Sequence, residues 1–497
     1  MPDVERILLE RNVPIPLRDG TTTYANVWRP ADGPPVPAIM VRTPYTKEVE
    51  EINVFSEPRV AAARGFAIVS QDVRGRGFSE GEFDPYFQEG ADGYDSIEHV
   101  AGLDWCSGHV FMVGNSYVGA TQWLAAVESP PSLTAIAPGL TPDAYDEGWT
   151  FHSGVLELAF IHSWVAGIFG PQDRLWLDDV ERSYAARDDL IAFAPWCEPW
   201  FREEIGSPYW QRCSIAARRD GVRVPALSIG GWHDTFLDGT LRNYAADSNP
   251  RSRLVVGPWG HDDWLTHLVG DRNLGVAGSG DAFGLFDREL EFFSAAVAGE
   301  DPPMAPVSAY MLGARRWLEL DAWPPPGAEA VSMPIPGASF AHDPASLPPS
   351  LGGRILKVNT AGGPGWGQYD QRPVAAHPGV ATIELGPPPA RMLAGPVRAR
   401  LATEASGADR ADWVLTLCVR DADGALLNLC EGIGRAQAGA AQVEVDLGNI
   451  CVELPAGAEL CLLAAGASYP RWEPLPERRR QAVGAGSTLE LTAVGDV

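Results

Sequence analysis

Lysine is almost missing from this chain, which carries it only at Lys47 and Lys357 although arginine is plentiful. Catalysis by a lysine nucleophile or base is therefore disfavoured. Basic side chains are scarce as a whole, with 38 Lys plus Arg against 65 Asp plus Glu and a formal net charge of −27. Such an acidic field repels phosphate backbones and anionic lipid headgroups, so we expect neither nucleic acid nor a membrane as a partner.

The sequence also lacks the patterns of a disulfide framework, a zinc site and a membrane span. Its 7 cysteines are an odd number, are widely scattered and include no CxxC pair, as expected of reduced core thiols. We therefore expect no metal and no cofactor. No uncharged run approaches the roughly 20 residues that cross a bilayer, and the amino-terminal stretch has no basic region followed by an apolar segment. These features predict a cytoplasmic protein, and they leave a homo-oligomer open.

The length and the apolar pattern predict several domains with an α/β core. A chain of 497 residues exceeds what one hydrophobic core usually holds. Short apolar runs alternate with helical segments from about residue 36 to 144, and the pattern resumes at 226, as in βαβ units with a mostly parallel sheet. The expected strands are residues 37–41, 66–70, 110–113, 133–137, 226–229 and 254–256.

Two other regions differ in pattern from this core. Residues 145–225 are rich in Trp, Phe and charged side chains with helical spacing, which predicts an inserted helical cap. After a Pro-rich joint (EDPPMAP, then WPPPG), short alternating strands and Gly/Pro turns predict an all-β sandwich. The expected division is 1–144 and 226–300 for the α/β domain, 145–225 for the cap and 301–497 for the sandwich.

A serine stands at a sharp turn in the segment HVFMVGNSYVGATQWLAAVES. The apolar run ends at Gly114, Ser116 follows after one residue, and a helical pattern begins at once, which is the outline of a nucleophile elbow. Gly114, Gly119 and Ala120 are small enough for the chain to turn there. The strict G-x-S-x-G pattern is broken by Val118, and a tight turn with a helix-capping serine is the simpler alternative.

Partners for this serine follow in the order that α/β-hydrolases use. Their acid and base come after the nucleophile, each at the carboxyl end of a later strand. Asp234 stands just past one expected strand in VPALSIGGWHDTF, and His261 just past the next in SRLVVGPWGHDD. We therefore predict an α/β-hydrolase in which Ser116, Asp234 and His261 are the catalytic residues.

Other assignments are available around the same two loops. His233 adjoins Asp234, and both Asp262 and Asp263 adjoin His261. A triad built from sequence neighbours would be strained, because adjacent side chains rarely face each other. His233 stays open as a pocket residue.

The expected roles follow from proton affinities. A serine hydroxyl is hardly ionised at neutral pH, so His261 takes its proton during attack and Asp234 orients the imidazole. The backbone N–H of Tyr117 is the first donor to the oxyanion. The segment VRTPYTK offers the hydroxyl of Tyr45 as a second, although a Pro-Tyr turn that only packs on the sheet fits the same residues.

Several segments together resemble the family of cocaine esterase and X-prolyl dipeptidyl aminopeptidases. They are RTPYTK, QDVRGRGFSEGEF, GNSYVG, GGWHDTF and GPWGH in this order, then YDQRPV and ASYPRWEP in the C-terminal region. The resemblance covers nearly the whole chain and implies a serine hydrolase with a helical cap and a C-terminal jelly roll. It implies the same nucleophile, acid and base, and it strengthens the assignment of Tyr45 and Tyr117 to the oxyanion hole.

The resemblance also implies an aromatic acyl pocket at Trp149, Trp164 and Phe236, for which ordinary cap packing is the alternative. QDVRGRGFSEGEF is expected to brace the active-site face rather than to bind phosphate, since no strand–loop–helix G-x-G-x-x-G pattern is present. YDQRPV lacks the fuller proline-rich form usual in the family, which leaves the contact between sandwich and catalytic domain undefined.

One departure from the family bears on the substrate. Relatives that hydrolyse α-amino-acid esters carry carboxylates just after the catalytic Asp to bind the ammonium group, whereas Thr235, Phe236 and Leu237 stand here. We therefore expect a small-molecule ester, or an amide, of a neutral or aromatic acyl group. The alternatives are a dipeptidyl peptidase for Xaa-Pro peptides, an α-amino-acid ester hydrolase or β-lactam acylase, and a binding protein whose hydrolase domain has decayed.

Overall fold

A large mixed sheet forms the centre of the catalytic half of the molecule. The computed structural model describes residues 6–49, 58–169, 180–261, 266–357, 365–406, 409–421, 423–437 and 439–495. Ten strands pair in the order β1-β2-β4-β3-β5-β6-β9-β10-β13-β14, and the strands from β4 to β13 run parallel to one another. The bounds are β1 Ile7–Pro16, β2 Thr22–Pro30, β3 Val36–Thr43, β4 Ala67–Asp72, β5 Cys106–Asn115, β6 Leu133–Gly139, β9 Leu227–Gly231, β10 Arg253–Gly257, β13 Val307–Met311 and β14 Arg316–Leu320.

Helices cover both faces of this sheet, because the parallel strands are apolar on both sides. Along β5, Val110 and Met112 pack into one core with α3 (Glu89–Ala101) and α4 (Tyr117–Ala126). Phe111 and Val113 pack into the other core, with α2 (Pro58–Ala63) and α13 (Leu285–Ala298). α11 (Leu237–Ala246) follows β9 and contacts it. The predicted α/β-hydrolase core is therefore confirmed, and each expected strand coincides with a strand of the sheet to within a few residues.

The sheet extends further than the sequence predicts. β13 pairs in parallel with β10, and β14 pairs antiparallel with β13. The expected boundary after residue 300 is thus wrong, since the catalytic sheet continues to Leu320. The physical reason is that a short apolar strand such as VSAYM carries no mark of the sheet it joins, and only pairing along β10 assigns it.

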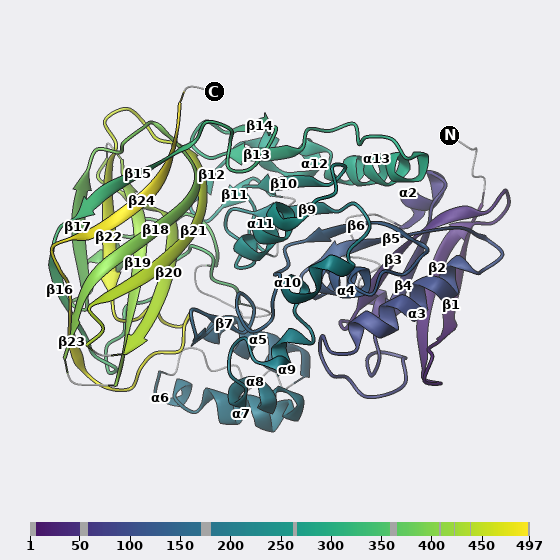
Figure 1. Cartoon of the computed structure of the whole chain (residues 1–497), viewed down its shortest axis with the longest axis horizontal. Coiled ribbons are helices and arrows are strands. Elements are labelled where there is room, and N and C mark those ends of the chain that lie inside the picture. Colours follow the sequence, from purple (N-terminus) through teal and green to yellow (C-terminus); the bar gives the residue numbers. More distant parts are fainter. Residues whose placement is uncertain are drawn as a thin grey trace.

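Short elements occupy the range expected to form the cap. They lie beneath the carboxyl ends of the parallel strands in the view of Figure 1. They comprise a hairpin, β7 (Phe151–His152) and β8 (Val155–Leu156), and the helices α5 (Leu158–Phe169), α6 (Val180–Ser183), α7 (Ala186–Phe193), α8 (Glu198–Arg202), α9 (Pro208–Gln211) and α10 (Ile215–Arg218), with 3₁₀ turns at Pro195–Cys197 and Arg219–Gly221. Short pieces near η4 (Val276–Gly278) complete the region after β10, namely β11 (Leu268–Val269), β12 (Arg272–Asn273) and α12 (Gly280–Phe283).

A separate β domain follows, at the left of Figure 1. One of its sheets has the order β15-β24-β18-β23-β16 with β21 also paired to β18, and the other has the order β17-β22-β19-β20. The bounds are β15 Glu329–Ile335, β16 Ala338–His342, β17 Val380–Gly386, β18 Met392–Ala405, β19 Arg410–Arg420, β20 Leu426–Gln437, β21 Gln442–Glu453, β22 Glu459–Ala465, β23 Arg479–Val483 and β24 Ser487–Val494, with the helical turn α14 at Arg372–Ala375. Its core is continuous with that around β13 and α11.

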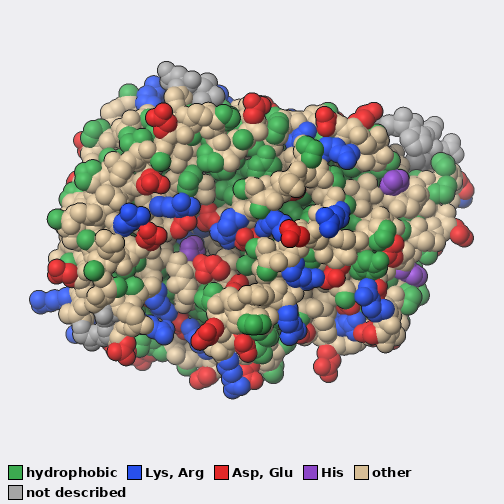
Figure 2. All heavy atoms as spheres, viewed as in Figure 1, with side chains coloured by type: hydrophobic (Ala, Val, Ile, Leu, Met, Phe, Trp, Pro, Cys, Tyr) green, Lys and Arg blue, Asp and Glu red, His purple; other side chains and the backbone are tan. Residues whose placement is uncertain are grey.

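No helix within the described residues is long and apolar enough to cross a membrane. Acidic and basic side chains are interspersed over the face seen in Figure 2, with apolar ones scattered between them. All seven cysteines are buried and unbridged.

Candidate active site

Ser116 stands at a strained turn between β5 and α4. Its backbone has φ 59° and ψ −128°, a conformation that L-residues rarely adopt and that is typical of a nucleophile elbow. The turn is held by the backbone, because the Ser116 N–H donates to the carbonyls of Gly139 and Leu140. The simpler alternative is contradicted, since the Ser116 side chain makes no capping hydrogen bond to the helix that it precedes.

The broken motif has a steric explanation. A Cβ on Gly114 would come within 2.3 Å of Val118 Cγ1, and Gly114 has φ +123°. Gly119, the residue after Val118, is also restricted to a small side chain. A Cβ there would lie 2.7 Å from the Gly139 carbonyl oxygen. Gly119 therefore lets α4 approach β6, and a valine before it is tolerated because its side chain fills the space beside Gly114.

Three side chains from distant parts of the chain form one hydrogen-bonded series. His261 Nε2 lies 2.8 Å from Ser116 Oγ, and His261 Nδ1 lies 2.7 Å from Asp234 Oδ1. Asp234 is fully buried, and its other oxygen accepts the N–H of Phe236. An imidazole held by a carboxylate at Nδ1 leaves Nε2 facing the serine hydroxyl, the arrangement that lets it accept a proton.

The competing histidine lies outside this series. His233 is buried, and its backbone N–H donates to the Trp259 carbonyl. The ring Nε2 has no hydrogen-bond partner among the described residues. Burial, together with the nearby Arg354, lowers the pKa of His233 to about 3, so its ring stays neutral. The other competing residues, Asp262 and Asp263, lie outside the described residues.

The loop after β3 carries Tyr45 and is held from beneath by a buried ion pair. Lys47 Nζ lies 2.9 Å from Asp72 Oδ2, and the Lys47 N–H donates to Asp72 Oδ1 at 2.7 Å. Both side chains are fully buried. Arg76 adds a hydrogen bond of 2.8 Å to the carbonyl of Pro44, directly before Tyr45.

Asp72 and Arg76 both belong to the segment QDVRGRGFSEGEF. The segment therefore has a structural role, which is to support the loop that carries Tyr45. The pair was missed in the sequence, although Lys47 is one of only two lysines and lies two residues from the predicted tyrosine.

Tyr117 contributes differently from Tyr45. Its side chain points into the protein, where its hydroxyl donates to Glu89 Oε1 at 2.8 Å and accepts the N–H of Tyr86. Burial raises the pKa of the Tyr117 phenol well above its usual range, so it stays neutral. Its backbone N–H belongs to the first turn of α4, where N–H groups lack a partner within the helix and are free to bind an anion.

The three aromatic residues expected to line an acyl pocket lie together beside the histidine. Phe236 packs edge-to-face on the His261 ring with centroids 5.1 Å apart, and Trp149 stacks on Phe236 at 4.7 Å. Trp164 is 5.7 Å from Trp149 and donates through Nε1 to the Tyr45 hydroxyl at 3.1 Å. All three are at most 1% exposed. The structure thus brings every predicted site residue to one place.

The first carboxylate after Asp234 is already neutralised. Asp238, at the start of α11, accepts from Arg354 Nη1 at 2.8 Å and from Asn449 Nδ2 at 3.3 Å. Arg354 and Asn449 belong to the β domain, and Arg354 lowers the pKa of Asp238 although burial opposes it. This carboxylate therefore anchors the β domain to α11.

A second buried contact joins the β domain to the cap. Trp472 Nε1 donates to Glu157 Oε1 at 2.8 Å, and Arg471 lies 3.7 Å from the same carboxylate while also binding Glu431. Arg471 and nearby polar groups lower the pKa of Glu157, although burial opposes the shift. Arg471 and Trp472 belong to the segment ASYPRWEP, so this motif docks the β domain on the residue that precedes α5.

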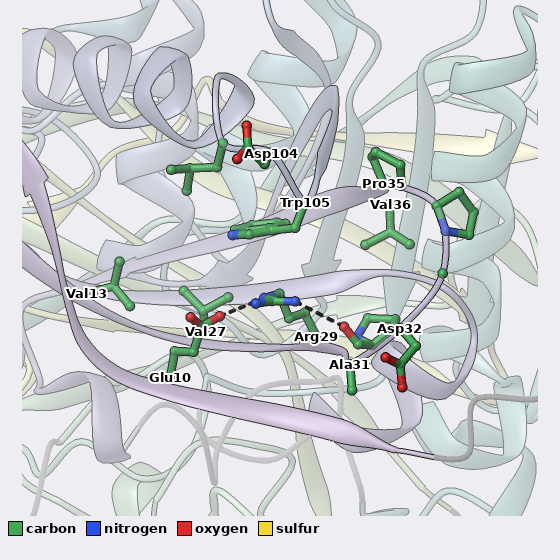
Figure 3. A pocket seen from close by; sticks show the side chains of 14 residues that line it. Glu10, Val13, Val27, Arg29, Ala31, Asp32, Pro35, Val36, Asp104 and Trp105 are labelled. Atoms are coloured by element: carbon green, nitrogen blue, oxygen red, sulfur yellow. Dashed lines mark hydrogen bonds and ion pairs between the residues drawn. The ribbon is translucent and has the colours of Figure 1, made fainter.

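A surface pocket of about 560 Å³ lies apart from these residues, between β1, β2 and the loop before β5. Figure 3 shows Trp105 over Arg29, which pairs with Glu10 at 2.6 Å, and the carboxylates of Asp32 and Asp104 at the edges. None of the predicted site residues lines it.

Comparisons with known proteins agree on the family. The family model described as X-Pro dipeptidyl-peptidase (S15 family) matches residues 19–263. Cocaine esterase from Rhodococcus sp. (strain MB1 Bresler) is 32% identical over 483 residues, covering 85% of this chain and 82% of the relative.

Solved structures agree on the fold over the full length. An aminopeptidase from the marine sediment archaeon Thaumarchaeota archaeon has a TM-score of 0.84 at 20% identity, covering 100% of this chain and 97% of the other. An α-amino acid ester hydrolase has a TM-score of 0.80 at 21% identity, covering 99% and 97%. Both therefore share the catalytic sheet and the C-terminal β domain with this chain.

Proposed function

Because the chain belongs to the acyl-hydrolase family of cocaine esterase and the S15 X-Pro dipeptidyl-peptidases, and is therefore a serine hydrolase, we propose that it cleaves a carboxylic ester through an acyl-enzyme on Ser116. The observation that carries the proposal is the hydrogen-bonded series from Ser116 through His261 to the buried Asp234. It begins at a strained elbow, where a serine hydroxyl has no evident structural use.

The chemical roles follow from the atoms involved. His261 Nε2 accepts the Ser116 proton as Oγ attacks the acyl carbon, and it then donates that proton to the departing alcohol. Water attacks the resulting acyl-enzyme with His261 again as the base. Asp234 holds the Nδ1–H tautomer and stabilises the imidazolium without taking up a proton.

The oxyanion is stabilised by two donors from different elements. They are the backbone N–H of Tyr117, at the amino end of α4, and the hydroxyl of Tyr45. The packing of the two tyrosine rings, with centroids 6.5 Å apart, supports this pairing. The Lys47–Asp72 pair acts on the reaction only by holding the loop of Tyr45.

We assign the acyl group to a neutral class, with an aromatic ring as the favoured member. Phe236 packs edge-to-face on His261 and stacks on Trp149, so aromatic side chains surround the proposed base. A substrate ammonium group would need a free carboxylate, whereas Asp238 is taken by Arg354 and Asn449. This favours esters of neutral acids, and amides of the same acids after them, over α-amino-acid esters, β-lactam acylation and Xaa-Pro peptides.

We assign the β domain to the jelly-roll type and the protein to the cytoplasm, supported by the two β sheets and by the seven unbridged cysteines. The reaction needs no metal and no cofactor. The partner is a small-molecule ester or amide rather than nucleic acid or a membrane, and a homo-oligomer is compatible with it.

A substrate panel tests the proposal. Phenyl and 4-nitrophenyl esters of acetic and benzoic acid, α-amino-acid esters and Xaa-Pro anilides are compared by kcat/KM, with Ser116→Ala as the control. We expect the neutral esters to be the best substrates and a fluorophosphonate to label the native protein but not the variant. Faster turnover of Xaa-Pro anilides would assign a peptidase, and absence of both labelling and turnover would assign a binding protein.

A further inference from the structure

Trp164 makes a polar contact that a residue serving only as an apolar pocket wall would not need. Its indole Nε1 donates to the hydroxyl oxygen of Tyr45 at 3.1 Å. An indole N–H is a donor only, whereas a phenol has one proton and two acceptor lone pairs. The Tyr45 proton therefore cannot be used on Trp164. The contact occupies an acceptor position of the oxygen and leaves the O–H to be directed elsewhere.

We propose that Trp164 is a positioning residue of the oxyanion hole, which orients the Tyr45 hydroxyl so that its proton faces the developing oxyanion. The inference rests on the proposed function. Donation into the phenol oxygen also polarises its O–H bond, because hydrogen bonds in a chain strengthen one another. Trp164 thus acts on the reaction through Tyr45 and needs no contact with the reacting atoms.

The indole is held firmly enough for this role. Trp164 is 1% exposed and packs edge-to-face on Trp149. It is carried by α5, and the first turn of this helix is tied to the β domain, because the Ala159 N–H donates to the Arg471 carbonyl at 3.3 Å. Trp472 Nε1 also donates to Oε1 of Glu157, the residue directly before α5, at 2.8 Å. The C-terminal domain therefore sets the position of the helix that carries Trp164.

A double-mutant cycle tests the role. Trp164→Phe removes the N–H and keeps an aromatic ring, and it is measured alone and in the Tyr45→Phe background with 4-nitrophenyl acetate, whose small acyl group makes little use of the aromatic pocket. Alone, we expect kcat to fall about two- to tenfold, the range of one hydrogen bond, with KM nearly unchanged. In the Tyr45→Phe background the same substitution should change kcat less than about 1.5-fold, since no hydroxyl remains to be oriented.

Trp200→Phe is the matched control. Trp200 is fully buried in the same cluster, its ring lies 6.4 Å from that of Trp164, and its Nε1 has no hydrogen-bond partner among the described residues. The variant makes the same chemical change without reaching Tyr45, so its kcat should stay within about twofold of the native value.

Three outcomes would overturn the inference. Equal loss of kcat from Trp164→Phe in both backgrounds would assign a packing role, and a rise in KM at constant kcat would assign acyl binding alone. Neither would touch the proposed ester hydrolysis. If Tyr45→Phe itself left kcat unchanged, the oxyanion assignment would fall together with this inference. Should Trp164→Phe not fold, Trp164→Leu removes the same N–H. Its effect on kcat is then compared between the native and the Tyr45→Phe backgrounds.

Discussion

The two sides of the candidate active site are built in different ways. On the nucleophilic side, Ser116, Asp234 and His261 all follow strands of one sheet, β5, β9 and β10. On the side proposed to receive the oxyanion and the acyl group, Tyr45 follows β3, whereas Trp149 and Trp164 come from the cap. The cap in turn is fixed by Arg471 and Trp472 of the β domain.

We expect this difference to separate nucleophilic attack and proton transfer from oxyanion stabilisation and the choice of acyl group. Strand ends in a packed sheet keep their spacing, so a proton-transfer series with contacts of 2.7 and 2.8 Å can be maintained there. The acyl side depends on contacts between domains and on one buried ion pair. We therefore expect substitutions on the nucleophilic side to abolish turnover. Substitutions on the other side should reduce turnover only in part, by different amounts.

The largest effect should come from Ser116→Ala. Loss of the nucleophile should reduce kcat on the order of 10⁶-fold, as when a catalytic serine is removed from other serine hydrolases. Fold and thermal stability should remain, because within the described residues the Ser116 hydroxyl makes a side-chain hydrogen bond only with His261. Steady-state kinetics with 4-nitrophenyl esters and fluorophosphonate labelling measure the effect. Turnover retained within tenfold would refute Ser116 as the nucleophile.

Tyr45→Phe comes next and addresses the other side. It removes one oxyanion donor while the ring keeps its packing on Tyr117, so kcat should fall on the order of 100- to 1,000-fold with a small change in KM. Labelling by a fluorophosphonate should persist, because the nucleophile is intact. A change under about threefold would mean that the Tyr45 hydroxyl does not reach the oxyanion.

Lys47→Met should act on the same side with a smaller effect on turnover. Removing the ammonium leaves Asp72 buried without its counter-ion, which should lower the free energy of unfolding by about 3–5 kcal/mol. In the folded fraction the loop of Tyr45 should loosen and kcat fall by up to about 100-fold. Denaturant titration and kinetics of the folded protein measure the two effects.

The only other lysine supplies the control for this variant. Lys357 is partly exposed, and burial lowers its pKa. Lys357→Met should change both quantities far less than Lys47→Met. Equal losses for the two variants would contradict a special role for the buried pair.

Glu289→Gln should leave turnover unchanged and alter the pH dependence of stability. Glu289 lies on α13, which carries no site residue, and burial raises its pKa from 4.5 to about 8. The folded state thus keeps a proton that the unfolded state loses, so stability present below pH 4.5 is lost as the pH rises to about 8.

A glutamine in this place has no proton to lose. The stability gained by Glu289→Gln should therefore grow between about pH 5 and pH 8 to a few kcal/mol, measured by denaturant titration at both pH values. A constant difference across this range would show that the carboxyl group is not held protonated.

Much of the catalytic sheet was predictable because its central strands are apolar on both faces. The strands at its edges were not, as β1 and β14 alternate between buried and exposed side chains and resemble strands of any antiparallel sheet. The joint after residue 300 misled for another reason, because β13 is a short, fully buried strand whose composition does not show which sheet it joins. Strand composition reports burial, whereas membership of a sheet is decided by which neighbour donates the hydrogen bonds.

The support around the site was not predictable. The pairs Lys47–Asp72, Asp238–Arg354 and Glu157–Arg471 join residues that are 25 to more than 300 positions apart, and each carboxylate alone could equally face solvent. The departure after Asp234 did indicate a neutral acyl group. It did not reveal that the next carboxylate, Asp238, is neutralised from another domain.

By itself the amino-acid sequence determined which residues are candidates for the reactive groups and in what order they follow, because a serine at a strand–helix turn and an acid and base at later strand ends are local patterns. Only the tertiary structure decided what holds Tyr45, how Asp238 is neutralised and how the cap is tied to the β domain. These depend on contacts between segments far apart in the chain, and no local spacing encodes the direction of a side chain across a domain boundary.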